Sequence, residues 1–157
     1  MPVPTPDTIY EQIREVKDGG KLVMLATASL EGKPNIAPMR FARRARGDVL
    51  VIADMYFCKT RVNLKENPNV ALSVAFPQRA ECPYVVHGQG HLAEKGSPGR
   101  LGELWDQWRD WGERNPPTEV PQGFGPPNPS CRAVLVIDAE DITSSEASSF
   151  GEQVTRT

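Results

Sequence analysis

Long apolar runs are absent from this sequence of 157 residues. A membrane-spanning helix needs about 20 consecutive apolar residues. The longest apolar runs here, such as Val49–Ala53 and Ala133–Ile137, have only the length of β-strands. The mean hydropathy of -0.43 and the chain length fit one soluble globular domain with a modest core. We therefore expect a single domain over residues 1–157 and no membrane partner.

Cysteine is scarce, and neither sign of charge is in excess. The three cysteines stand far apart without CxxC spacing, which argues against a disulfide framework and a structural zinc site: Cys58, Cys82 and Cys131. Eighteen basic against 20 acidic residues give a net charge of -2, so we expect no nucleic-acid partner. The opening MPVPTPDTIYEQ lacks the apolar core of a signal peptide. These features together indicate a reducing cytoplasm.

Short strand patterns dominate what is present. Six apolar or alternating segments predict β-strands: 21–30, 35–43, 49–54, 70–76, 83–94 and 131–139. Short turns join the first three strands, which predicts an antiparallel meander. Gly88 and Gly90 indicate a bulge or a close backbone approach. Because few helices interrupt the strands, we expect a mainly β protein with a small barrel rather than a doubly wound sheet.

Three helices are expected, one before the first strand and two between later strands. One begins at Thr5-Pro6-Asp7 and ends at Gly19-Gly20, and one covers Lys59–Asn67 and stops at Pro68. The third opens at Ser97-Pro98 with a capping serine, and its apolar side carries Leu101, Leu104, Trp105, Trp108 and Trp111. These tryptophans can stack on a planar ligand, but their helical spacing favours packing. Residues 116–130, with six prolines and two glycines, predict a loop, and a polar tail follows from about residue 141.

The loop after residue 54 is the most informative candidate site. A buried strand ends at Asp54, and a short loop brings Lys59 and Thr60 to a helix start. Amides at a helix N-terminus bind anions, and a lysine and a hydroxyl add charge and donors, which suits a phosphate. A surface lysine beside an N-cap threonine explains the same residues. In the predicted strand over 35–43, Pro38 indicates an irregular hydrogen-bond ladder. Arg40 of the same strand is expected near the proposed phosphate site. A solvated hairpin accounts for Arg43, Arg44 and Arg46.

The stretch from Leu22 to Leu92 resembles the FMN-binding split barrels related to pyridoxamine 5'-phosphate oxidase. The segments that carry the resemblance are LATASLEGKPNIAPM, VLVIAD, KTRVNLKENPNVALSV and VHGQGHLAE, and RAVLVIDAEDI resembles the last strand of the family. The resemblance implies a six-stranded antiparallel split barrel. It also implies a homodimer with FMN near the subunit interface and a flavin-dependent oxidoreductase activity.

The resemblance further implies which residues meet the cofactor. The pair Lys59 and Thr60 holds the FMN phosphate, Cys58 offers a backbone amide beside it, and Asn63 braces the loop. Two further groups lie along the ribityl chain and line the ring: Pro38, Met39 and Arg40, and Ala53, Asp54 and Met55. No residue is indicated as catalytic.

Several alternatives stay open from the sequence. The final SSEASSFGEQVTRT lacks the basic substrate-binding motif of true pyridoxamine phosphate oxidases, which argues against vitamin B6 oxidation. A flavin reductase-like enzyme, a non-catalytic FMN carrier, a relative that binds the deazaflavin F420 and a barrel that serves as an interaction module all fit. His87 and His91 share one side of a strand and can pair on a metal. No acid or cysteine stands at matching spacing, so we expect surface or interface histidines and no metal site.

Overall fold

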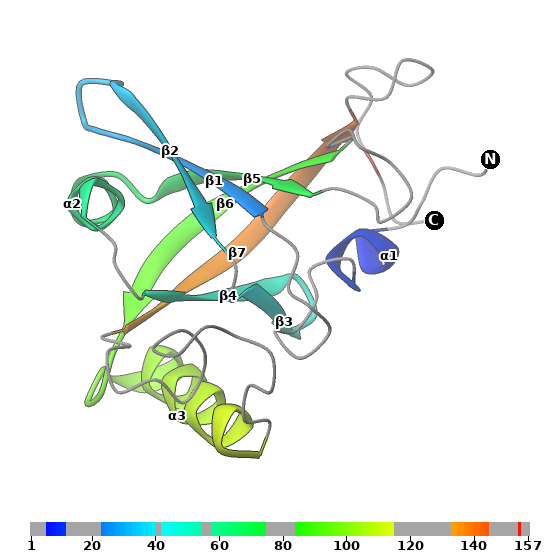
Figure 1. Ribbon diagram of the computed structural model, residues 1–157, viewed down its shortest axis with the longest axis vertical. Helices are drawn as coiled ribbons and strands as arrows, with labels where there is room; N and C mark the ends of the chain where they lie inside the picture. The colour runs from blue at the N-terminus through cyan, green and yellow to red at the C-terminus, as the bar shows by residue number, and fades with distance from the viewer. Residues whose placement is uncertain are drawn as a thin grey trace.

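The computed structural model describes residues 6–11, 23–39, 42–54, 58–74, 84–114, 133–144 and 154. Its seven strands are β1 Val23–Ala28, β2 Pro34–Met39, β3 Ala42–Arg46, β4 Val49–Asp54, β5 Asn69–Val74, β6 Tyr84–Ala93 and β7 Ala133–Ser144. Its three helices are α1 Pro6–Glu11, α2 Lys59–Glu66 and α3 Gly99–Arg114. The strands form one curled sheet in the order β2-β1-β5-β6-β7-β4-β3, and neighbouring strands in it are antiparallel (Figure 1). The expected mainly β, antiparallel fold is confirmed.

The predicted strand over residues 35–43 and the predicted meander are wrong. The structure contains two strands there: β2 pairs with β1, whereas β3 pairs with β4. These two strands form opposite edges of the sheet. Pro38, inside β2, has no N–H to donate to a neighbour, which restricts this strand to an edge. Among the described residues the sheet therefore has seven strands instead of the expected six, because the two halves of the predicted strand pair with different partners.

Alternating side chains from the strands build the barrel core. Along each strand, every second side chain points inward. Examples, each at most 1% exposed, are Leu25, Ile52, Leu72, Val86 and Leu135. This period of two is what a curled sheet with one enclosed face requires. The helix α2 lies beside the β1–β2 hairpin, at one end of the sheet (Figure 1).

A second apolar cluster lies on the outer face of the sheet, under α3. Leu104, Trp105 and Trp108 are buried there against alternate residues of β4 and β7, including Val51 and Val134. The packing interpretation is therefore confirmed for Trp105 and Trp108, and the side chain of Trp111 lies outside the described residues. The hydroxyl of Ser97, expected to cap this helix, instead accepts a hydrogen bond from the backbone N–H of Glu94 at 2.9 Å.

An ion pair fixes the first turn of α3 to the sheet. Arg100 donates to both carboxylate oxygens of Asp138, at 2.6 and 2.8 Å. These hydrogen bonds lower the pKa of Asp138 below its ordinary value, and the charge of His91 adds to the effect. Both side chains are more than a third exposed, so the pair orients the helix more than it stabilises the fold.

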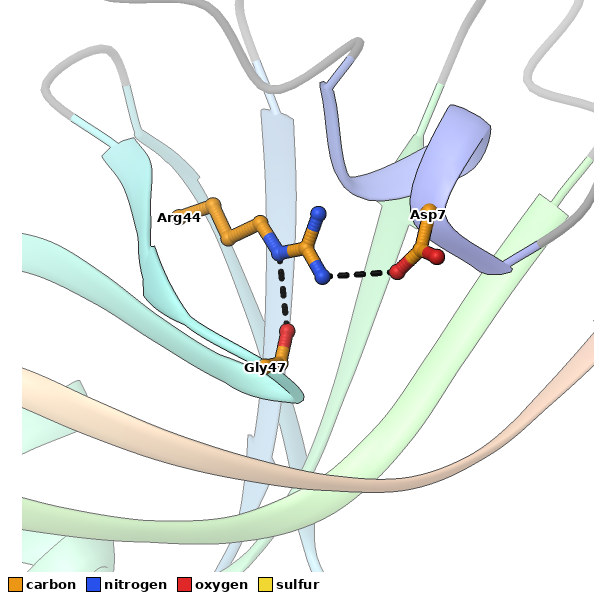
Figure 2. Close-up of polar contacts among 3 residues, drawn as sticks. All are labelled: Asp7, Arg44 and Gly47. Atoms are coloured by element: carbon orange, nitrogen blue, oxygen red, sulfur yellow. Dashed lines mark hydrogen bonds and ion pairs between the residues drawn. The ribbon is translucent and has the colours of Figure 1, made fainter.

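The short helix α1 is attached to the β3–β4 hairpin by Arg44 (Figure 2). The guanidinium of Arg44 pairs with Asp7 at 2.6 Å, donates from Nε to the carbonyl of Gly47 at 2.8 Å, and lies 5.6 Å from the ring centre of Tyr10. Arg44 lies in the expected hairpin, but its side chain is paired with α1 and the turn instead of being only solvated. A charge pattern alone does not show that a helix far away in the sequence supplies the partners. The attachment places Ile9, which is 0% exposed, in the barrel core.

Two glycines of β6 meet their neighbours closely, as the sequence predicts. The register shifts between His87 and Gly88, which is the expected bulge. A Cβ at Gly88 would overlap the carbonyl oxygen of Asp138 and lie 3.0 Å from its carbonyl carbon. At Gly90 it would lie 2.9–3.1 Å from methyl groups of neighbouring side chains. Position 88 therefore admits only glycine without a backbone shift.

Two of the three cysteines, Cys82 and Cys131, and the predicted loop over 116–130 lie outside the described residues. Strand β7 continues to Ser144, so the first residues of the expected polar tail belong to the sheet. No helix among the described residues combines the length and apolar character needed to cross a bilayer.

Candidate functional site

The start of α2 is the centre of the candidate site. Cys58 occupies the N-cap position but makes no side-chain hydrogen bond to the helix, and its thiol is exposed. Ordinary N-cap residues satisfy an orphan amide of the first turn with a side-chain oxygen. Lys59 follows, also exposed. A helix start without a side-chain cap, next to the exposed ammonium group of Lys59, forms an electropositive end that suits an anion.

A second cation, Arg61, belongs to the same turn. Its guanidinium lies 3.7 Å from a carboxylate oxygen of Glu94, and its side chain is 20% exposed. This carboxylate offsets part of the charge of Arg61. The exposed charge at the helix start is therefore supplied chiefly by Lys59.

The side chain of Thr60 points toward the sheet. Thr60 is 3% exposed, and its hydroxyl oxygen accepts a hydrogen bond from Nδ2 of Asn35 on β2, at 3.4 Å. Its backbone remains part of the first turn of α2. Thr60 can therefore offer an anion its backbone amide, while its side chain links the helix to β2.

Asn63 and Asn67 hold the rest of α2 against the β1–β2 hairpin. Asn63 is 0% exposed and donates from Nδ2 to the hydroxyl oxygen of Thr27 at 3.1 Å. Asn67 donates to the carbonyl oxygen of Ser29 at 3.4 Å. Asn63 thus has the bracing contact that the sequence comparison implied. The sequence patterns did not identify Asn35 and Thr27, although both are polar residues at inward positions of strands.

The other expected cofactor residues lie on β2 and β4. Met39 is 8% exposed with its side chain in the barrel core, whereas the neighbouring Pro38 is exposed. Ala53 is 5% exposed and packs in the cluster under α3. Met39 and Ala53 can therefore offer a ligand mainly their backbone. Three of the predicted cofactor contacts lie outside the described residues: Arg40, Met55 and the side chain of Asp54.

The two histidines have separate carboxylate neighbours. His87 Nδ1 lies 2.9 Å from Asp141 Oδ1, and each side chain is 42% exposed. His91 lies near Asp138, which Arg100 already pairs. Within the part of the chain that the structure describes, no three His, Cys, Asp or Glu side chains group as metal ligands would. The contact between His87 and Asp141 joins β6 to β7.

The sequence profile of the pyridoxamine 5'-phosphate oxidase family matches residues 9–145. The chain belongs to the pyridoxamine 5'-phosphate oxidase family. A relative from Methanocaldococcus jannaschii, an uncharacterised protein, is 35% identical over 89 residues. This alignment covers 55% of the present chain and 58% of the relative, so the chain spans little more than half the length of the curated relative it matches.

Solved structures share the fold over most of the chain. HupZ of Group A Streptococcus aligns with a TM-score of 0.66 and 18% identity, covering 98% of this chain and 100% of that one. An FMN-binding protein from Syntrophomonas wolfei aligns with a TM-score of 0.56 and 17% identity over 88% and 86% of the two chains. An F420 reductase aligns with a TM-score of 0.53 and 20% identity over 91% and 98%. The curled sheet is therefore a split barrel of the FMN-binding type.

Proposed function

We propose that this member of the family binds FMN and is a flavin-dependent oxidoreductase. The observation that carries the proposal is the uncapped start of α2 with the exposed Lys59. A phosphate dianion fits this donor set, because the amides of the first turn and the ammonium group both favour negative charge. The family membership and the fold of the FMN-binding relative support the same ligand.

Two elements of the fold contact the cofactor, the start of α2 and the edge strand β2. Lys59 and the first-turn amides of Cys58 and Thr60 hold the phosphate, and the edge strand β2 meets the rest of the flavin through the backbone near Pro38 and Met39. We assign Arg40, Ala53, Asp54 and Met55 to the same cofactor. When bound, the flavin supplies two-electron redox chemistry, while the protein binds and orients it.

A second candidate ligand is the deazaflavin F420. The F420 reductase with the same fold over 91% of the chain favours it. F420 also carries a phosphate, so the start of α2 fits either ligand. The ring and the side chain beyond the phosphate distinguish the two by mass and by absorption.

The visible absorption spectrum of the purified protein tests the proposal, followed by mass spectrometry of the heat-released ligand. We expect flavin bands and the mass of FMN, or uptake of added FMN if the protein is purified colourless. Release or uptake of F420 instead would support the second candidate. A colourless protein that binds neither added cofactor would contradict both and leave an interaction module.

We propose that the protein is a homodimer that associates through the outer face of β2, β1 and β5. Ile36 is 65% exposed on this face. Ile36 is in register with Ala26 on β1, which is in register with Ala71 on β5. The two small alanine side chains make the surface next to the protruding Ile36 side chain flat. A twofold axis can set Ile36 of each copy against the alanines of the other, which removes apolar surface from water.

The variant Ile36→Lys tests this face. A lysine there would carry its charge into the contact of the two copies, so we expect the dimer Kd to rise by at least about tenfold. Sedimentation velocity over a concentration series measures the change. Leu30→Lys, at a residue 71% exposed in the β1–β2 turn, is the matched control and should leave the Kd unchanged. An unaltered dimer in Ile36→Lys places the interface elsewhere.

A further inference from the structure

The buried face of α2 is polar. Its three buried residues are Thr60, Asn63 and Leu64, of which only leucine is apolar. Helices commonly pack on a sheet through an apolar stripe. Hydrogen bonds, which depend on direction, therefore contribute much of the attachment of α2, and they fix its orientation more narrowly than apolar contact does.

The hydrogen bonds connect residues that are in register on both sides. Thr27 of β1 and Asn35 of β2 are direct partners across the hairpin, and Thr60 and Asn63 lie one turn apart on α2. Asn35 donates to Thr60 at 3.4 Å, and Asn63 donates to Thr27 at 3.1 Å. We call these four residues the Thr-Asn quartet. Each strand of the hairpin is thus tied to one turn of the helix.

The quartet is not built for stability alone. Within the described part of the chain, Oδ1 of Asn63 is buried without a hydrogen-bond partner, and an unpaired buried acceptor costs free energy. A pair of apolar side chains would avoid this cost. Polar contacts that are kept despite it are consistent with a role in fixing geometry. Because Lys59 directly precedes Thr60, the geometry fixed here is that of the α2 start relative to β2.

We infer that the Thr-Asn quartet positions the phosphate-binding end of the site against the flavin-binding strand. Asn35 is the central positioning residue, since it reaches from β2 to the second residue of α2. The inference rests on the proposed function. The spacing that the quartet sets matters to a ligand that contacts both elements, as FMN does. Riboflavin, which has the same ring and ribityl chain without the phosphate, meets β2 but not the helix start.

Titrations of the apo-protein with FMN and with riboflavin test the inference. The quenching of flavin fluorescence on binding gives the Kd of each ligand. Asn35→Ala removes the donor to Thr60, and Asn35 is only half-buried, so the fold tolerates the change. We expect its Kd for FMN to rise about tenfold, the effect of one hydrogen bond on affinity, with the Kd for riboflavin unchanged. The single variant Thr60→Ser keeps the oxygen that accepts this hydrogen bond, so its Kd for FMN should stay close to that of the wild type.

Asn69→Ala is the matched control. It removes another asparagine that makes a side-chain hydrogen bond, from Gln89 Nε2 to Asn69 Oδ1 at 2.6 Å, on an exposed position of β5. If Asn35→Ala raises the Kd for FMN and the Kd for riboflavin by the same factor, Asn35 has only a structural role, and the inference is overturned. If the wild type does not bind riboflavin, equal FMN Kd values for Asn35→Ala and Asn69→Ala would overturn it. A wild type that fails to bind FMN contradicts the proposed function itself, and the inference falls with it.

Discussion

Lys59→Glu is expected to raise the Kd for FMN by about 100-fold. The change removes a charge-assisted hydrogen bond to the phosphate, which contributes about 1.5–3 kcal/mol, and places a like charge beside it. The stability of the apo-protein should move in the opposite direction. A carboxylate at a helix start interacts favourably with the helix dipole, whereas the lysine does not. We therefore expect the Tm of the apo-protein to rise by about 1–3 °C.

Opposite effects on binding and stability separate a ligand contact from damage to the fold. Fluorescence titration with FMN and thermal unfolding of the apo-protein measure the two quantities. Lys65→Glu is the matched control, because Lys65 is exposed in the last turn of the same helix. There the same charge change should leave the Kd for FMN unaltered and lower the Tm slightly. An unchanged Kd for FMN in Lys59→Glu would contradict the phosphate assignment.

Gly88→Ala is expected to destabilise the fold by about 3 kcal/mol or more. Its new Cβ would overlap the carbonyl oxygen of Asp138 across the bulge between β6 and β7. A backbone carbonyl in a ladder cannot rotate away as a side chain can, so the two strands must separate locally. At this chain length the loss corresponds to a fall in Tm of about 6–12 °C.

Substitutions at two further glycines give smaller expected losses of stability, with which Gly88→Ala can be compared. Gly90→Ala should cost less, because its closest neighbours are methyl groups at the ends of side chains, which can shift. Gly32→Asn should cost least, since nothing lies within 4 Å and asparagine tolerates its φ of 83°. Chemical denaturation gives the order. A Gly88→Ala protein as stable as Gly32→Asn would show that the β6–β7 contact is looser than described.

Local sequence patterns predicted most elements of the fold. Alternating apolar residues predicted β5, and the run over Val49–Asp54 predicted β4 with its observed bounds. Lys59 and Pro68 marked where α2 begins and where it stops. The separation of β2 from β3 was not predictable in the same way. Periodicity reports which face of a strand is buried but carries no information on which neighbour each half of a run will choose.

The candidate site was predictable only in part for a related reason. Lys59 and Thr60 stand in a motif along the chain, so the sequence comparison found them. Asn35 and Thr27 contribute through contacts with residues 25 and 36 positions away, and no local pattern marks them. Arg44 shows the same limit, because its partner Asp7 lies 37 positions away.

The place of β7 in the sheet has a consequence for the order of folding. Seven described strands form two groups, β2-β1-β5-β6 and β4-β3, and β7 lies between β6 and β4. Of these strands β7 is the last to leave the ribosome, so the two groups emerge without the element that joins them. Until then the edges of β6 and β4 offer unpaired backbone to other chains. We therefore expect newly made chains to be most exposed to aggregation before β7 has been synthesised.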